Sequence, residues 1–236
     1  MSNGTVLILG SGPNAPKASA WPRASFDRIV VINNAWRIRS DWDDLIYPYD
    51  FPDERMPARI RPEQRLIDQT HFVPAQNAYG GFLYAGATMA FTAGYWALHA
   101  LAPRVIAFFG CDMHYAGTET HFYGVGTADP LRNDISLRSL EAKSARLMVY
   151  AARQRCAVVN LSTNPSRLVC PRAALADLSS AEPSEIVPTS AEKASEWEAR
   201  LSYTTPNGFH AHWVETADLA ALDAIDALWR DAISGS

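Results

Sequence analysis

Short runs of apolar residues alternate with longer amphipathic stretches along most of the chain. The first run, Val6–Leu9, is apolar at four consecutive positions and fits a strand buried on both faces. Runs of this kind predict strands at Val6–Leu9, Arg28–Ile32, Asp44–Tyr47, His71–Pro74, Val105–Phe109 and Ala157–Leu161. Because strands that alternate with helices form parallel sheets, we expect an α/β, Rossmann-like three-layer sandwich with a mostly parallel sheet.

Apolar residues at helical spacing predict the helices of this sandwich. One helix runs from about Gly86 to Leu101 and ends before Pro103. Another runs from about Ile135 to Gln154, with Asp134 as its expected N-cap.

Composition shifts divide the chain into three parts. We expect a nucleotide-binding domain over residues 1–172, a linker over 173–190 and a small α/β appendage, helical with a hairpin, over 191–236. Three local patterns describe the appendage: a capping box at Thr189–Glu192 before a short helix, a hairpin turn at Pro206–Gly208, and an amphipathic helix from Thr216. The last helix should pack on the body or on a second subunit.

The overall composition narrows the class of protein. The 236 residues are 48% hydrophobic, which supports one substantial core. No apolar run could span a bilayer and no signal segment is recognisable, so a cytoplasmic location is expected. The three cysteines show neither metal spacing nor a disulfide framework, which favours buried, reduced thiols.

Charge is distributed unevenly between the two ends of the chain. Residues 1–170 hold 17 Lys/Arg against 14 Asp/Glu, whereas residues 171–236 hold 4 against 11. The basic excess is too small to indicate nucleic-acid binding. The acidic end is expected to be a solvated helical face.

The first predicted strand ends in a glycine-rich turn, Gly10-Ser11-Gly12-Pro13-Asn14, whose spacing to Ala15 matches a relaxed dinucleotide fingerprint. Glycine permits close backbone approach, and a helix that follows would direct its free N–H groups towards an anion. The turn therefore indicates a nucleotide site, and a tight strand–helix turn without a ligand is the alternative.

The second predicted strand ends in Asn33 and Asn34, where a NAD-binding fold has an acidic residue. An amide both donates and accepts hydrogen bonds, but it cannot replace that carboxylate on the ribose. The pair therefore argues against NAD. Ordinary turn chemistry at a strand end is the alternative.

The strand Val105–Phe109 leads into a polar, aromatic segment and then a long loop that continues to Pro130. His114 and His121 are the best candidates for a general base, because histidine titrates nearest to neutral pH. Asp112 could hold a substrate hydroxyl or a metal, or it could cap neighbouring backbone groups. A metal site made of Asp112, His114 and His121 is disfavoured because their spacing is not specific.

Small residues also precede the helix predicted over 86–101. Ala85, Gly86 and Thr88 would let a ligand approach its N-terminus, although close helix–sheet packing explains them equally well. Arg132 and Arg138 could reach an anionic ligand or lie in solvent.

The order of these motifs resembles the bacterial lipooligosaccharide sialyltransferases over about residues 5–165. It is also similar to a wider set of Rossmann-like proteins that includes a pterin pyrophosphokinase-like domain. The sialyltransferase resemblance implies that the CMP part of a donor binds at Gly12, Asn14 and Asn34. Gly10, Ser11 and Asn33 are further nucleotide-binding candidates because they belong to the same turn and strand end. It also implies a donor cleft lined by Ala85, Gly86 and Thr88.

That family uses no metal, a histidine base in a lid, and tyrosines on the departing phosphate. By resemblance, His121 is the expected base with His114 behind it, and Tyr115 and Tyr123 are expected at the phosphate. Arg132 is a further candidate for the phosphate because of its charge. The family pattern at the strand tip is Asp-Phe-Tyr, whereas this chain has Asp112-Met113-His114-Tyr115. A different sugar donor, or an inactive relative, therefore stays open.

The sequence thus predicts a metal-independent glycosyltransferase that takes a nucleotide-sugar donor and a saccharide acceptor without a cofactor. A Mg²⁺-dependent pyrophosphokinase-like enzyme and a non-catalytic nucleotide-binding protein are the alternatives. No nucleic-acid partner is expected, whereas peripheral membrane association and homo-oligomers are left open.

Overall fold

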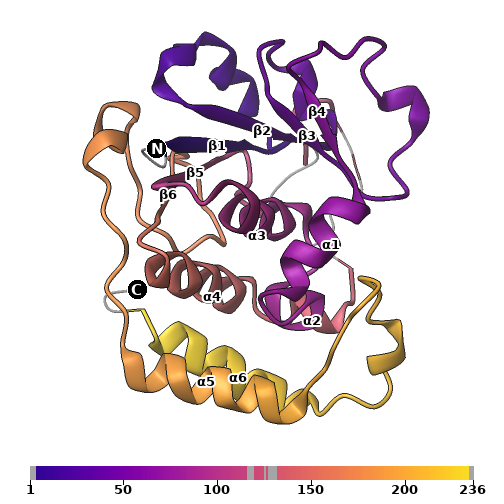
Figure 1. The fold of residues 1–236 in the computed structure, drawn as a ribbon, viewed down its shortest axis with the longest axis vertical. Helices are drawn as coiled ribbons and strands as arrows, with labels where there is room; N and C mark the ends of the chain where they lie inside the picture. Colours follow the sequence, from indigo (N-terminus) through magenta and orange to yellow (C-terminus); the bar gives the residue numbers. More distant parts are fainter. Residues whose placement is uncertain (1–3, 116–119, 125, 127–131, 234–236) are drawn as a thin grey trace.

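The computed structural model describes residues 4–115, 120–124, 126 and 132–233. Within these ranges one sheet contains six strands in the order β4-β3-β2-β1-β5-β6, and every neighbouring pair is parallel (Figure 1). The strands are β1 (Thr5–Leu9), β2 (Arg28–Ile32), β3 (Asp44–Ile46), β4 (Arg65–Ile67), β5 (Val105–Phe109) and β6 (Ala157–Asn160). The predicted α/β, Rossmann-like class is confirmed.

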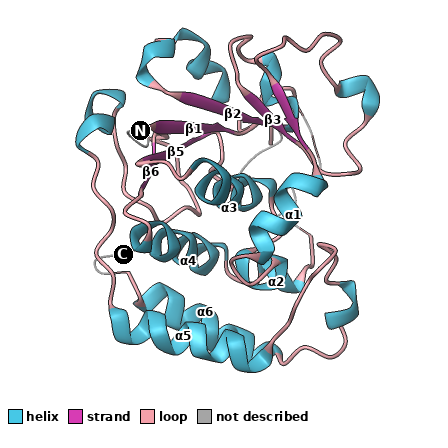
Figure 2. Cartoon of the chain, in the orientation of Figure 1, coloured by secondary structure: helices cyan, strands magenta, loops and turns pink. Residues whose placement is uncertain are grey.

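The α-helices lie on one side of this sheet in two successive layers (Figure 2). The helices are α1 (Gln69–Asn77), α2 (Phe82–Ala85), α3 (Met89–Leu101), α4 (Leu140–Arg153), α5 (Pro188–Leu201) and α6 (Leu219–Asp231). Helices α1, α3 and α4 contact strands of the sheet, α2 packs on α1 and α4, and α5 and α6 pack beyond α4. Short 3₁₀ turns, among them Ala15–Ala20 and Leu175–Ser180, cover the opposite face.

The central strand β1 is buried on both faces, as its apolar run predicts. Val6 and Ile8 belong to the core beneath the helices, and Leu7 and Leu9 belong to the core on the other face. This separation follows from the two-residue period of a strand. Each fully buried aliphatic side chain of this kind contributes about 1.5–3 kcal/mol of transfer free energy.

The strand order creates a topological switch point beside β1. The chain passes from β1 to β2 on one side, and β5 returns on the other side of β1. Ligands of open α/β sheets bind where the carboxyl ends of such strands diverge. The ends of β1, β2 and β5 are therefore the part of the fold on which a site is expected.

The prediction of a strand at His71–Pro74 is wrong, because these residues lie inside helix α1. Asp68 caps this helix by accepting a hydrogen bond from the Thr70 N–H, and Phe72 and Ala75 form its buried face. A short apolar run does not distinguish a strand from a buried helix. The fourth strand is instead β4, just before the helix.

The predicted helix starts also shift. The segment 135–154 divides into a 3₁₀ turn, Ile135–Leu137, which Asp134 caps, and helix α4, which Ser139 caps. Helix α5 begins at Pro188, so the expected capping box at Thr189–Glu192 is wrong. Proline is favoured in the first helical turn, where its missing N–H costs nothing.

The predicted hairpin around Pro206–Gly208 does not form. A turn is present, with the Gly208 N–H donating to Thr205 O at 2.9 Å, but no strand flanks it in the described residues between α5 and α6. The one regular segment between these helices in that range is a 3₁₀ turn at Ala211–Trp213. The described part of the C-terminal appendage is therefore helical.

The acidic end of the chain was expected to be a solvated helical face, but part of it is buried. Glu198 on α5 and Asp226 on α6 are buried and pair with Arg146 and Lys143 of α4. The outer helices and α4 belong to one buried apolar cluster. The apolar face of α6 thus packs on the body, which is one of the two predicted possibilities.

Two expectations from composition can be compared directly with the described residues. Cys111, Cys156 and Cys170 are buried free thiols, and burial raises the pKa of Cys156 and of Cys170 to about 12. None of the helices in the described ranges has the length and apolarity needed to cross a bilayer.

Candidate functional site

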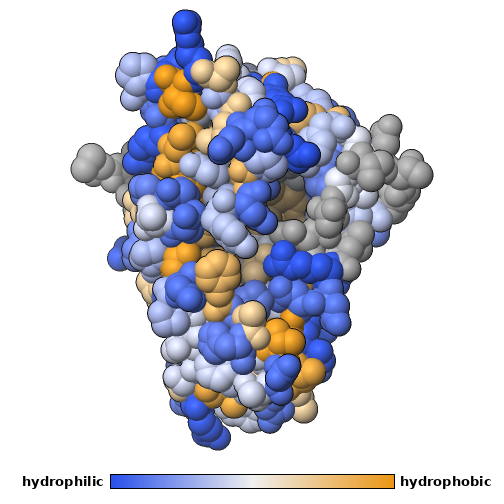
Figure 3. All heavy atoms as spheres, turned by 90° about the vertical axis from the view of Figure 1, so that its right-hand side faces the viewer, coloured by the Kyte–Doolittle hydropathy of each residue, from blue (hydrophilic) through white to orange (hydrophobic). Residues whose placement is uncertain are grey.

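A cavity of about 900 Å³ opens at the carboxyl edge of the sheet, where β1, β2 and β5 end. Figure 3 faces this edge and shows a hollow beside the grey atoms of residues outside the described ranges. Five parts of the chain supply most of the lining: residues 10–13, 32–37, 48–55, 88–90 and 110–126. Within the last of these, residues 116–119 and 125 lie outside the described ranges, as do residues 127–130 of the predicted loop and residue 131 after it.

Most of the predicted site residues meet in this cavity. Its lining includes Gly10, Ser11, Gly12, Asn33, Asn34, Thr88, Asp112, His114, Tyr115, His121 and Tyr123. They come from the ends of three strands, the start of α3 and the loop after β5. The fold thus brings together residues that are up to 113 positions apart, from Gly10 to Tyr123.

Five of the predicted residues do not line the cavity, and one of them, Arg138, pairs with Asp223 on α6. Asn14 is buried and donates to Ser162 Oγ at 2.8 Å. Ala85 and Gly86 form the tight turn between α2 and α3, where a Cβ on Gly86 would lie 2.9 Å from the Phe91 ring. Arg132 pairs with Asp134 and donates to the backbone at Ala87. Ala85 and Gly86 are therefore small because the chain packs closely there, which was the predicted alternative to a role in ligand binding.

The glycine turn after β1 packs directly against the turn after β5. The Gly10 N–H donates to Phe109 O at 2.8 Å, and the Gly12 N–H donates to Gly110 O at the same distance. A Cβ on Gly10 would lie 2.4 Å from Gly110 O. Close approach of two loops therefore accounts for both glycines, and their N–H groups are already engaged.

The prediction that a helix follows the glycine turn is wrong, since only a short 3₁₀ segment, Ala15–Ala20, forms there. It ends at Ala20, and the extended backbone of the next residue, Trp21, suits a residue before Pro22. The helix N-terminus at the cavity is instead that of α3. Thr88 caps it by accepting a hydrogen bond from Phe91 N, and Met89 and Ala90 also line the cavity.

Asn33 and Asn34 present unsatisfied acceptors at the end of β2. The side-chain oxygen of each is buried and has no hydrogen-bond partner within the described ranges. Asn34 is only 3% exposed, and Asn33 adopts a left-handed backbone with φ 51°, which asparagine tolerates better than most residues. A buried acceptor left unpaired is costly, so these oxygens suit a ligand that brings hydroxyl or amino donors.

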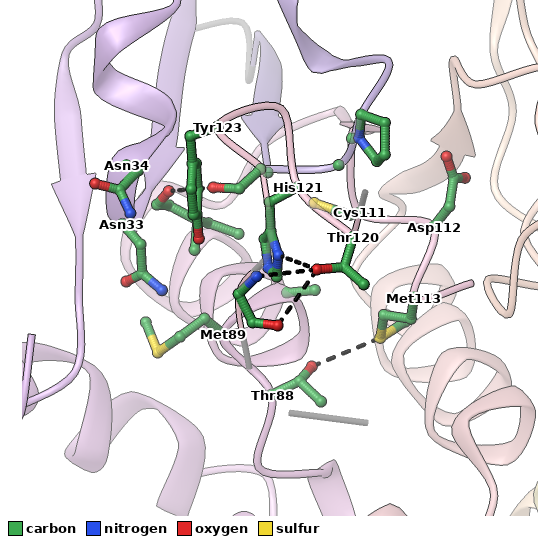
Figure 4. Close-up of a pocket in the computed structure, with 18 of the residues that line it drawn as sticks. Asn33, Asn34, Thr88, Met89, Cys111, Asp112, Met113, Thr120, His121 and Tyr123 are labelled. Carbon is green, nitrogen blue, oxygen red and sulfur yellow. Dashed lines mark hydrogen bonds between the residues drawn. The ribbon is translucent and has the colours of Figure 1, made fainter. Parts of the chain in front are cut away.

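Asp112 is saturated by neighbouring side chains. Its carboxylate accepts hydrogen bonds from Asn14 at 3.2 Å, from Asn160 at 3.1 Å and from Ser162 at 2.6 Å. In Figure 4 this carboxyl group points away from His121. Asp112 therefore ties together the loops that follow β1, β5 and β6. Among the residues that the structure describes, no cluster of three or more His, Cys, Asp or Glu could hold a metal ion.

His121 stands among aromatic rings in the lining. Its ring stacks on Tyr123 with centroids 5.0 Å apart, and Tyr115 lies 6.0 Å away on the same measure. Its Nδ1 lies 2.9 Å from Thr120 Oγ1, which also accepts from the Gly126 N–H (Figure 4). Burial lowers the pKa of His121, which keeps the imidazole neutral at pH 7.

The Thr120 contact bears on the tautomer of His121. The Thr120 hydroxyl can donate to Gly126 O at 3.3 Å and accept the proton of His121 Nδ1. In that arrangement Nε2 carries a lone pair and can serve as a base. The second candidate base, His114, has an exposed side chain in the same lining.

Sequence reasoning missed two arginines in the lining, Arg37 and Arg55. Both are exposed, and neither forms an ion pair within the described ranges. Arg37 ends the short 3₁₀ turn that begins at Asn33, so its closeness in sequence to the predicted site could have identified it. Arg55 lies in the long connection between β3 and β4, and long loops inside compact domains are usually functional.

Comparisons of the chain with protein-family models, with curated proteins and with solved structures found no match.

Proposed function

We propose that the protein is a metal-independent glycosyltransferase that binds a nucleotide-sugar donor in this cavity and uses His121 as its base. One observation carries the proposal. A neutral histidine, held by Thr120 and stacked on Tyr123, lines the same cavity as the unpartnered amide oxygens of Asn33 and Asn34. The order of motifs that resembles the lipooligosaccharide sialyltransferases favours CMP as the nucleotide.

The cavity suits a nucleotide in size and in chemistry. Its volume of about 900 Å³ falls in the range typical of small-molecule sites. The oxygens of Asn33 and Asn34 would accept hydrogen bonds from ribose hydroxyls or from an exocyclic amine. The N-terminus of α3 would place its positive dipole end beside an anionic part of the ligand.

The transfer would proceed by general base catalysis. Nε2 of His121 takes the proton of a saccharide hydroxyl, and that oxygen forms a bond to the anomeric carbon of the donor. The bond from this carbon to the phosphate oxygen breaks, and the nucleotide leaves with the electron pair. The hydroxyls of Tyr115 and Tyr123 would donate hydrogen bonds to the departing phosphate.

Binding is tested by thermal shift with CMP, CDP, UDP, GDP, ATP and NAD, each with and without Mg²⁺. Stabilisation by CMP without metal supports the proposal. Stabilisation by ATP that requires Mg²⁺ would overturn it in favour of a pyrophosphokinase-like enzyme. A response to NAD alone would overturn the interpretation of Asn33 and Asn34.

Catalysis is tested by the release of CMP from CMP-sialic acid, with and without saccharide acceptors. His121→Ala should lower the rate at least about 100-fold, as expected for loss of a general base, and leave the Kd for CMP within about threefold. His71→Ala, an exposed histidine on α1, is the control. If His114→Ala abolishes turnover and His121→Ala does not, the base is His114.

A further inference from the structure

Positive charge lines the cavity on the side where β2 and β3 end. Arg37 closes the 3₁₀ turn that follows β2, and Arg55 closes the 3₁₀ turn Asp53–Arg55 in the connection after β3. The lining also contains two carboxylates in the described ranges. Asp112 is saturated by its neighbours, and Asp50 is exposed and makes no ion pair there.

Trp36 holds the two arginine-bearing segments together. Its indole N–H donates to the backbone oxygen of Arg55 at 3.0 Å, and the Arg37 guanidinium lies 5.4 Å from the centre of its ring. A single side chain thus fixes the backbone of one segment and contacts the guanidinium of the other. The two arginines are therefore kept on the same side of the cavity.

Other arginines of this region have carboxylate partners. Arg28 and Arg65 both bind Asp44, and Arg39 binds both oxygens of Asp41 through its Nε and Nη2. Arg37 and Arg55 line the cavity, and no such partner exists for them within the described ranges. Arg59 also lacks an ion pair there, but it lies outside the lining, which makes it a matched control.

We propose that Arg37 and Arg55 form an anion-binding subsite for a phosphate or carboxylate carried by the ligand of this cavity. Guanidinium groups bind such anions in a bidentate manner, and a pair of them selects for charge at one end of a ligand. Asn34 is a residue only 3% exposed whose side-chain oxygen has no partner within the described ranges, so it would accept from donors on the same ligand. The ligand therefore combines hydroxyl or amino groups with an acidic group.

This inference rests on the proposed function for the nature of the ligand, and two sources of the anion fit that function. The acidic group is either the phosphate of the nucleotide donor or a carboxylate of an acidic saccharide acceptor. Both present oxygen pairs that match a guanidinium.

The subsite itself is tested with inorganic pyrophosphate, which requires no nucleotide. We expect pyrophosphate to raise the Tm of the wild-type protein in low salt and to leave the Tm of the variant R37Q/R55Q unchanged. Arg59→Gln should respond as the wild type does. The same shift in the double variant, or no shift in the wild type, would overturn the subsite.

The source of the anion is tested with CMP, with cytidine and with acidic and neutral acceptors. If the arginines hold the donor phosphate, R37Q/R55Q weakens CMP binding about tenfold or more and leaves cytidine binding unchanged. If they hold an acidic acceptor, CMP binding is unchanged, and KM rises for a carboxylate-bearing acceptor but not for a neutral one. Unchanged CMP binding together with unchanged KM for both acceptors would overturn the inference.

Failure of the proposed function gives a different result. If no nucleotide binds and no CMP is released, while pyrophosphate protects the wild type and not the double variant, the glycosyltransferase proposal fails. The anion subsite then stands by itself.

Discussion

The buried Arg146–Glu198 ion pair beneath the C-terminal helices and the asparagine pair in the cavity differ in how their polar atoms are partnered. Under α5 and α6, the fully buried guanidinium of Arg146 donates to both oxygens of Glu198, at 2.8 and 2.6 Å. Trp229 also donates to Glu198, and the Tyr95 hydroxyl accepts from Arg146. In the cavity, by contrast, the side-chain oxygens of Asn33 and Asn34 have no partner within the described ranges.

The polar atoms of the Arg146–Glu198 ion pair find partners within the protein, whereas the two amide oxygens at the cavity find none within the described ranges. A buried ion pair whose donors and acceptors are matched needs nothing from outside the chain. Unmatched acceptors also occur outside the cavity, on Gln76 and on Asp226 of α6, but those of Asn33 and Asn34 belong to residues that line it, where a ligand would supply donors. The four predictions that follow would break or sharpen this distinction.

The largest effect is expected beneath the helices. Glu198→Ala leaves the charge of Arg146 buried and unpaired, so the free energy of unfolding should fall by about 3–5 kcal/mol in urea titrations. Glu196→Ala, an exposed neighbour on α5, is the control and should change it by less than about 0.5 kcal/mol. A loss below about 1 kcal/mol for Glu198→Ala would mean that water or another group relieves Arg146.

Gly10 lies in the cavity lining, but its conformation serves the fold. Gly10→Ala would place a Cβ against Gly110 O, so the two loops must separate, and we expect a loss of about 1–3 kcal/mol without any ligand. Ser11→Ala, at the next position, should cost less than about 0.5 kcal/mol. Chemical denaturation measures both losses. If Gly10→Ala keeps the full stability of the wild type, Gly10 is not needed for loop packing, and ligand binding is its remaining role.

Asn34 should show the opposite behaviour to Glu198. Asn34→Leu keeps a similar volume and removes the unpartnered oxygen, so the free energy of unfolding should stay within about 1 kcal/mol of the wild type. The Kd for CMP, measured by calorimetry, should rise about tenfold or more, which corresponds to one lost hydrogen bond. Exposed Asn207→Leu is the control for both measurements. If Asn34→Leu loses stability and binds CMP as the wild type does, Asn34 has a structural role, as Glu198 has, and not a ligand-binding one.

The smallest effect is expected from the titration of His121. Because burial lowers its pKa in the folded state, the unfolded chain binds more protons at this residue, and stability rises with pH through this window. Acidification from the unfolded pKa of about 6.5 to the lowered folded value should cost no more than a few tenths of a kcal/mol, since the ring is partly exposed. His121→Gln should lose this part of the pH dependence. An identical pH profile of stability in the variant would contradict the role of burial.

The sequence predicted those parts of the fold that local pattern determines. Buried strands such as Val6–Leu9 and Val105–Phe109 were recognised because an uninterrupted apolar run must be covered on both faces. His71–Pro74 was misassigned because four residues do not separate a strand from a helix, and Pro206–Gly208 made a turn without a hairpin. The sequence also marked most of the residues that line the cavity, since they follow strand ends.

What the sequence by itself determined is therefore the parallel α/β sheet and the strand ends that carry polar residues. Tertiary structure decided which of these polar groups are used up inside the protein. The Asp112 carboxylate is engaged by Asn14, Asn160 and Ser162, and 148 positions of chain separate Asn14 from Ser162. The side-chain oxygen of Asn34, like that of Asn14, has no partner within the described ranges. Only folding brings such distant groups within hydrogen-bonding distance. The same reason hid Arg55, which the chain between β3 and β4 brings beside Arg37 and into hydrogen-bonding contact with Trp36.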